Sequence, residues 1–269
     1  MTTQPEVDKV QGCLIGFAIG DALGAPYEFE RQPIEIEMTF KEGVFGTRPG
    51  EGTDDSWMAR CAAEAIVDGK IDISRYLDNL SEWAWEAKDI GNQTYRSVHA
   101  WRDGRRLAPD DTALGNGSLL TTHVAACFLT EDEAAEISSA THPAPKATKI
   151  TRYLYRRIAT ELGRPHAVIT RPDHMLIDTS LTHQRPIGLG EKTYSVAVEA
   201  LAECQTAADA LGALQRVVER GGDTDSNAAV AGGLLGARFG MAAWNSFEEL
   251  GRLEMLDYWM TVANEKVVV

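Results

Sequence analysis

Basic residues are in deficit in this sequence of 269 residues, which contains 26 Lys and Arg against 40 Asp and Glu. The formal net charge is therefore −14. Proteins that bind nucleic acid cluster Lys and Arg against the phosphate charge, and anionic membrane surfaces attract the same residues. We therefore expect neither a nucleic acid nor a membrane among the partners of this protein.

Cysteines are few, and no two of them lie close together in the sequence. The four cysteines are Cys13, Cys61, Cys127 and Cys204, and no two of them form the CxxC spacing of a metal or redox motif. Each has apolar neighbours, and a free cysteine in such surroundings behaves as a small hydrophobic residue. We therefore predict four reduced thiols in the core rather than disulfides or a thiolate metal site.

Long hydrophobic runs are also missing. No segment approaches the roughly 18 apolar residues that a membrane-spanning helix needs. The first residues, MTTQPEVDK, lack the basic start and the apolar stretch of a secretory signal. Together with reduced thiols, these absences favour a cytoplasmic protein, which we expect to be a monomer.

Helical periodicity is what the sequence has in abundance. In segment 9–26, for example, Val10, Cys13, Leu14 and Phe17 follow the i, i+3, i+4 rhythm. The same kind of pattern predicts further helices over 56–67, 73–88, 118–129, 131–140, 147–162, 194–203, 207–220, 227–239 and 247–263. Thr130, with Glu133 three residues on, predicts a capping box at the start of the helix over 131–140. No convincing run of alternating strand residues interrupts them. The expected fold is all-α, with residues 1–269 in a single domain.

Glycine recurs every four residues in the first of these helices, at Gly12, Gly16, Gly20 and Gly24. Each glycine costs a helix about 1 kcal/mol relative to alanine. The spacing places all four on one side of the helix, where another backbone can approach closely. We therefore expect close packing or a ligand along this stripe.

Residues 163–191 have no clear period, and proline and histidine are frequent among them, with His166, His174 and His183. The spacing of these histidines fits no helical metal-ligand pattern. We interpret the segment as an irregular excursion between helices, a candidate lid or specificity loop.

Two short acidic turns carry the chemical information, Gly52–Ser56 and Gly221–Ser226. Each places two carboxylates and nearby hydroxyls at the start of a predicted helix. Helix capping is one explanation, because Asp, Ser and Thr are favoured there. Four clustered carboxylates would repel one another, however, unless cations lay among them. If the two turns converge, they offer the oxygen ligands that one or two Mg²⁺ or Mn²⁺ ions prefer.

Around these turns the sequence resembles the ADP-ribosylglycohydrolase family, which includes the dinitrogenase-reductase-activating and ADP-ribosyl-acceptor hydrolases. The resemblance rests on six blocks in the same order, spanning about 12–240. They are the opening helix Gly12–Glu28, Thr53–Asp55, Asp89–Asn92, Gly115–Ser118, Thr141–Pro143 and Gly221–Asp225. One departure is Leu120-Thr121, where many relatives have Met-Arg.

The resemblance implies an orthogonal helical bundle with two divalent cations, Mg²⁺ or Mn²⁺. It implies hydrolysis of the glycosidic bond between ADP-ribose and a protein acceptor, with arginine the expected linkage. An ADP-ribosylated protein and ADP-ribose would then be the partners. The metal ligands that it implies are Thr53, Asp54, Asp55, Asp223, Asp225 and Ser226, the last often a threonine in the family.

For catalysis the resemblance offers two carboxylates, Glu28 and Asp89, and the good match around Asp89 favours that residue. It places the ADP-ribose near His142 and Gly222. The turn Asn116, Gly117 and Ser118 leads into a helix, so that its backbone N–H groups are candidates to bind the diphosphate.

Other functions stay open from the sequence. The linkage could instead be to serine, to a free ADP-ribose derivative or to a modified nucleic acid. The protein could also be a non-catalytic ADP-ribose-binding or crystallin-like relative, although the retained acidic residues argue against this. A third class is an immunity protein that opposes a toxin ADP-ribosyltransferase.

Overall fold

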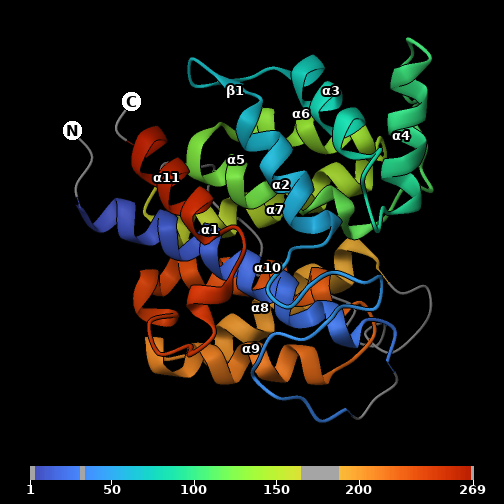
Figure 1. The fold of residues 1–269 in the computed structure, drawn as a ribbon. Helices are drawn as coiled ribbons and strands as arrows, with labels where there is room; N and C mark the ends of the chain where they lie inside the picture. The colour runs from blue at the N-terminus through green and yellow to red at the C-terminus, as the bar shows by residue number, and fades with distance from the viewer. Residues whose placement is uncertain (1–3, 31–33, 165–187, 268–269) are drawn as a thin grey trace.

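The computed structural model describes residues 4–30, 34–164 and 188–267. Its centre is helix α1 (Gln4–Gly24), which crosses the molecule and packs along helix α10 (Thr224–Phe239) (Figure 1). The predicted glycine stripe forms this contact. A Cβ atom at Gly20 would overlap the backbone of Ala228, and one at Gly16 would overlap that of Gly232. Close backbone packing therefore explains the glycines of α1.

The remaining helices surround this central pair (Figure 1). The helices that follow α1 in the chain are α2 (Asp54–Glu64), α3 (Ile73–Trp83), α4 (Asn92–Arg102), α5 (Thr122–Phe128), α6 (Glu131–Thr141) and α7 (Pro145–Leu162). The later helices are α8 (Gly190–Glu203), α9 (Ala210–Glu219) and α11 (Leu256–Val267). Short 3-10 helices are η1 (Ala25–Tyr27), η2 (Asn116–Ser118), η5 (Ala207–Asp209), η6 (Gly240–Ala243) and η7 (Leu250–Arg252).

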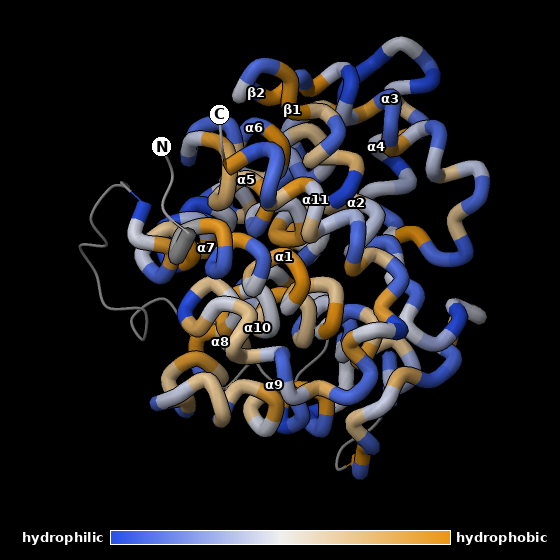
Figure 2. The backbone as a smooth tube through the Cα atoms, turned by 60° about the vertical axis from the view of Figure 1, so that its left-hand side comes forward, coloured by the Kyte–Doolittle hydropathy of each residue, from blue (hydrophilic) through white to orange (hydrophobic). Residues whose placement is uncertain are grey.

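One large buried cluster joins helices from both halves of the chain. Figure 2 shows hydrophobic residues concentrated around α1 and hydrophilic ones toward the periphery. Residues 12–24 of α1 are all buried, so apolar residues such as Leu14, Ile15 and Phe17 need not share one face. The buried indole of Trp244 packs against α1 at Gly16 and donates a hydrogen bond from Nε1 to the Gly12 carbonyl at 2.8 Å.

The expectation of an all-α fold is confirmed, and so are two local predictions, the capping box and the buried thiols. Helix α6 begins with a capping box, in which Thr130 and Glu133 each bond the other's backbone N–H. All four cysteines are free and buried. Within the described residues, no helix is both long and apolar enough to cross a membrane.

Some boundaries differ from the sequence-based expectation. The helix predicted over 56–67 ends at Glu64, and a hairpin follows, with β1 (Ile66–Val67) antiparallel to β2 (Lys70–Ile71). The hairpin turn is Asp68-Gly69, both with positive φ, a strong signal for a two-residue turn.

Helix boundaries also differ elsewhere. Helix α4 was not predicted, and the helix expected over 247–263 is divided into η7 and α11. Most of the predicted excursion, residues 165–187 with its three histidines, lies outside the described residues.

Candidate metal and catalytic site

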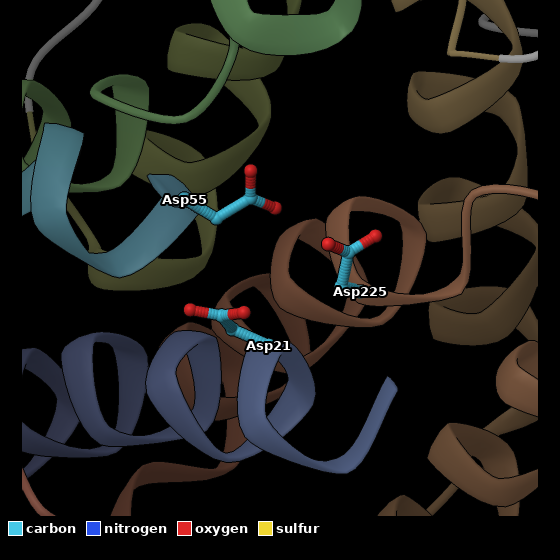
Figure 3. Close-up of side chains that lie close together, drawn as sticks. All are labelled: Asp21, Asp55 and Asp225. Atoms are coloured by element: carbon cyan, nitrogen blue, oxygen red, sulfur yellow. The ribbon is translucent and has the colours of Figure 1, made fainter. Parts of the chain in front are cut away.

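The two acidic turns converge at the end of α1. Thr53–Asp55 starts α2, and Asp223–Asp225 starts α10. Asp21, Asp55 and Asp225 point toward a common space from three different helices (Figure 3). One carboxylate oxygen from each of these three lies within 4.8 Å of the others.

A second set of three carboxylates adjoins the first. Glu28, Asp223 and Asp225 also bring one oxygen each within 4.8 Å of the others. Asp225 belongs to both sets, so the two groups of oxygens are neighbours in one acidic centre. We call the five residues Asp21, Glu28, Asp55, Asp223 and Asp225 the acidic centre.

Asp21 organises the first turn, and sequence analysis did not select it. Its carboxylate accepts hydrogen bonds from the backbone N–H groups of Thr53 at 3.0 Å and Ser56 at 3.1 Å. Both hydroxyls also donate to it, that of Thr53 at 2.7 Å. The side chain is completely buried, and these bonds occupy both of its oxygens. The sequence did contain a signal for this role, namely an aspartate inside the apolar segment 9–26, because a buried charge needs partners.

Two carboxylate oxygens of the acidic centre are buried without a hydrogen-bond partner in the described structure. They are Oδ2 of Asp55 and Oδ1 of Asp225. A buried polar atom of this kind is costly unless it is satisfied. Hard divalent cations bind such oxygens, so this donor set fits Mg²⁺ or Mn²⁺. Ser226 lies beside it and lowers the pKa of Asp55 by hydrogen bonding, against the larger effect of burial.

The electrostatics of the metal-free protein agree with this fit. Burial, followed by repulsion from Asp89, raises the pKa of Asp54 to about 7. Burial, followed by repulsion from Asp223, raises the pKa of Glu28 to about 9. Burial raises the pKa values of Asp55 and Asp225 well above the ordinary value. Without cations the centre therefore retains protons near neutral pH, and a bound cation would replace them.

The segment around Asp89 is joined to the first turn by a hydrogen bond. The N–H of Gly91, at the start of α4, donates to Oδ2 of Asp54 at 2.9 Å. Asp89 itself is half-buried, and burial raises its pKa. The structure thus brings Asp89 to the same cavity as Glu28, the other carboxylate that the sequence offered for catalysis.

Gly222 supports Glu28 through the backbone. Its carbonyl accepts a hydrogen bond from the N–H of Phe29 at 2.7 Å, and its own N–H donates to the Glu30 carbonyl at 3.2 Å. Its φ of +85° is in the left-handed region that favours glycine. Gly222 does not line the cavity described next. Gly222 therefore holds the Glu28 segment in place, and its expected contact with the ligand stays a prediction.

A cavity of about 460 Å³ opens over the acidic centre. Carboxylates line part of it, and Asn116, Gly117 and His142 line another part. The exposed rings of Phe29 and Phe45 stand at the same cavity and contact each other edge to face. The sequence analysis did not select these two aromatic residues. Thr53 does not line the cavity, because its hydroxyl is directed to Asp21.

The Asn116–Ser118 turn differs from the expected diphosphate site. The N–H of Asn116 donates to the Gly188 carbonyl at 2.8 Å, and the N–H of Ser118 donates to the Gly115 carbonyl at 3.4 Å. Ser118 is also buried outside the cavity. These two amides are engaged within the fold, so the turn does not offer three free N–H groups. The side chain of Asn116 instead donates to Oδ2 of Asp223 at 3.1 Å.

His142 forms the wall beneath this turn. Burial lowers its pKa to about 4, so the ring is neutral at pH 7. Its Nδ1 lies 2.9 Å from the Thr141 hydroxyl. A Cβ atom at Gly117 would lie 2.7 Å from the ring, which explains why glycine is needed above it.

The chain is similar to known proteins over most of its length. The family model described as ADP-ribosylglycohydrolase matches residues 1–254. The ADP-ribosylarginine hydrolase Tri1 of Pseudomonas putida (strain GB-1) is 29% identical over 275 residues, covering 90% of this chain and 73% of that protein. The ADP-ribosyl-[dinitrogen reductase] glycohydrolase of Rhodospirillum rubrum is 26% identical, covering 89% and 88% respectively. A solved structure titled ADP-ribosylglycohydrolase-related protein complex matches the fold over 97% of both chains, with a TM-score of 0.77 and 23% identity.

Proposed function

The chain belongs to the ADP-ribosylglycohydrolase family, and from this premise we propose that it is a metal-dependent hydrolase of protein-linked ADP-ribose. The observation that carries the proposal is the acidic centre, with two unsatisfied buried oxygens at the wall of a cavity. We propose arginine as the acceptor, supported by the relative that is named an ADP-ribosylarginine hydrolase.

Two divalent cations, Mg²⁺ or Mn²⁺, are proposed for the acidic centre. The two overlapping sets of carboxylates support two adjacent positions, with Asp225 between them. Asp55 and Asp223 would contribute to one position each, and Asp54 and Ser226 line the same cavity. When bound, such cations orient substrate hydroxyls and lower the pKa of water. Asp21, whose oxygens are occupied, would position Thr53 and the first turn of α2.

The reaction requires one proton to be removed and one to be supplied. The oxygen of water forms a bond to the anomeric carbon of the ribose, and the bond from that carbon to the guanidine nitrogen breaks. The bonding electron pair passes to this nitrogen, which must gain a proton as it departs. The transition state resembles that of glycoside hydrolysis.

We propose Asp89 as the group that gives this proton to the departing nitrogen. Burial raises its pKa, which is the direction that a general acid needs. It lies on the cavity wall, near the acidic centre but outside both carboxylate sets. Glu28, with a pKa of about 9, is the competing carboxyl. Replacing each by its amide separates them, because only the true acid loses turnover while substrate still binds.

The part of the cavity lined by Asn116, Gly117 and His142 is proposed to hold the rest of the ADP-ribose. His142 is neutral, so it can form hydrogen bonds without adding charge. Gly117 lets the ligand approach the backbone above the ring. The side chain of Asn116 connects this wall to Asp223, so ligand contacts there also adjust the acidic centre.

The test compares release of ADP-ribose from arginine-linked and serine-linked proteins, with Mg²⁺, with Mn²⁺ and with EDTA. The proposal predicts metal-dependent release from arginine, abolished by Asp223→Ala. Release from serine alone would overturn the arginine assignment. No metal-dependent release from either substrate, with ADP-ribose still binding, would instead establish a non-catalytic binding protein.

A further inference from the structure

A second, larger cavity lies beside the first, between helices α2 and α3, which run next to each other in Figure 1. Its volume is about 590 Å³. We call it the α2–α3 groove; Trp57 and Arg60 of α2 line one side, and Glu82 and Trp83 of α3 line the other. Asp54 and Asp89 line both cavities, so the two are adjacent at these carboxylates.

The α2–α3 groove has an excess of negative charge. Six carboxylates and three cationic side chains line it. The cations already have partners, since Lys88 pairs with Glu51 at 2.7 Å and Arg60 pairs with Glu64 at 2.8 Å. Arg48 likewise pairs outside the groove with Glu254 at 2.8 Å.

Two exposed carboxylates of the groove, Glu82 and Glu86, form no ion pair with any cation of the described residues. They lie on α3 and on the segment just after it. A positively charged ligand would therefore find partners here, whereas an acidic one would be repelled.

The groove also contains an aromatic surface suited to a guanidinium group. The rings of Trp57 and Trp83 are stacked, with centroids 6.3 Å apart and an angle of 15° between their planes. The guanidinium of Arg60 lies 4.9 Å from the centroid of Trp57. An indole here already accepts a guanidinium from the protein itself, in the arrangement of a cation–π contact.

We infer that the α2–α3 groove binds the stretch of the target protein next to the modified arginine, and that it selects stretches with further cationic residues. The inference rests on the proposed function. The glycosidic bond would lie at the acidic centre, and Asp89 would give its proton to the arginine nitrogen. From the acidic centre the acceptor chain would pass directly into the α2–α3 groove, because Asp54 and Asp89 line both cavities. Glu82 and Glu86 then set the preference for positive charge.

The experiment measures binding of two labelled peptides to the full chain by fluorescence polarisation. One peptide has an arginine flanked by further arginines, and the other has the same arginine flanked by glutamates. The test variant is E82K/E86K. The matched control is E136K/E248K, which makes the same change in net charge at two exposed glutamates outside both cavities.

The inference predicts that the wild-type chain prefers the arginine-flanked peptide. It also predicts that E82K/E86K weakens this binding at least about fivefold, while the control changes it less than about twofold. Equal losses in both variants, no loss in either, or no preference in the wild-type chain would overturn it. Binding does not require turnover, so a protein that shows the preference but fails to release arginine-linked ADP-ribose refutes only the proposed function.

Discussion

The two acidic turns look alike in the sequence, yet the structure supports them differently. In the first, Thr53 caps α2 by accepting a hydrogen bond from the N–H of Asp55 at 3.3 Å, and Asp21 holds Thr53 in turn. In the second, the side chain of Asp223 makes no capping bond to α10. Its Oδ2 instead accepts a hydrogen bond from the side chain of Asn116. Helix capping therefore explains one hydroxyl of the first turn but none of the paired carboxylates.

Some residues thus hold the two turns in shape, whereas others have carboxylates that are free to bind a cation. The first turn is held by a buried carboxylate whose oxygens are all engaged. The second turn depends on two left-handed glycines, Gly221 and Gly222, and leaves its carboxylates toward the cavity. We therefore expect changes at free carboxylates to affect activity most, and changes in the supporting residues to have graded effects.

The largest effect is expected for Asp225→Asn, because both carboxylate sets include Asp225. Loss of a direct ligand should exceed the 10–100-fold effect typical of supporting residues. We expect ADP-ribose release and Mn²⁺ affinity each to fall by more than about 100-fold. Asp209→Asn is the control, since Asp209 caps a helix outside the site. Activity retained within tenfold in Asp225→Asn would contradict the role of the shared carboxylate.

A smaller effect is expected for Asp21→Asn, which tests the support of the first turn. The amide retains one acceptor oxygen but loses the charge and part of the network to Thr53 and Ser56. We expect Mn²⁺ affinity to fall about 10–100-fold and the free energy of unfolding of the metal-free protein to fall by about 1–3 kcal/mol. Calorimetric titration and thermal unfolding measure these two quantities. If neither changes, Asp21 does not position the turn.

The stability of the metal-free protein should depend on pH in a definite direction. The pKa values of Asp54 and Glu28 in the folded state, about 7 and about 9, exceed those of unfolded carboxyls near 4. Between about pH 4 and pH 9 the unfolded chain therefore binds fewer protons, so these groups lower stability as pH rises. Thermal unfolding in EDTA should show the midpoint falling from pH 5 to pH 8.

Mn²⁺ should reverse that trend, because it replaces protons on the same carboxylates. The rise in unfolding midpoint on adding Mn²⁺ should be larger at pH 8 than at pH 5. The double variant D54N/E28Q should flatten the pH dependence in EDTA. A midpoint that rises with pH in the metal-free wild-type chain would show that the carboxylates are not protonated in the fold.

The smallest effect is expected at the glycine turn of the second region. Gly222→Ala places a side chain in the left-handed region and should cost about 1–2 kcal/mol. Gly222→Asn should cost less, because asparagine tolerates that conformation. Urea unfolding of the two variants measures the difference. Equal losses of unfolding free energy in the two variants would mean that the left-handed conformation of Gly222 does not determine the stability of the turn.

How far the sequence predicts the structure depends on whether a signal is local. The capping box of α6 and the glycine stripe of α1 are local patterns, and both predictions are confirmed. Asp21 was missed as a site residue because its partners, Thr53 and Ser56, are far along the chain. Its burial is visible only once α1 and α2 pack together.

The cavity next to the acidic centre was predictable in part only. The sequence selected Asn116, Gly117 and His142, and the structure places all three at one cavity. It could not show that the amide of Asn116 is bonded to Gly188, since that contact closes the turn against α8. The α2–α3 groove left no signal in any single motif, because its two walls come from different helices.

We propose that both acidic turns together hold the cations used in hydrolysis. A Mn²⁺ titration of the metal-free chain tests this by following bound metal and ADP-ribose release from arginine-linked protein in the same samples. We expect two Mn²⁺ per chain, with release that rises with occupancy and is lost together with binding in Asp225→Asn. Full release in EDTA, or Mn²⁺ binding that Asp225→Asn leaves unchanged, would contradict it.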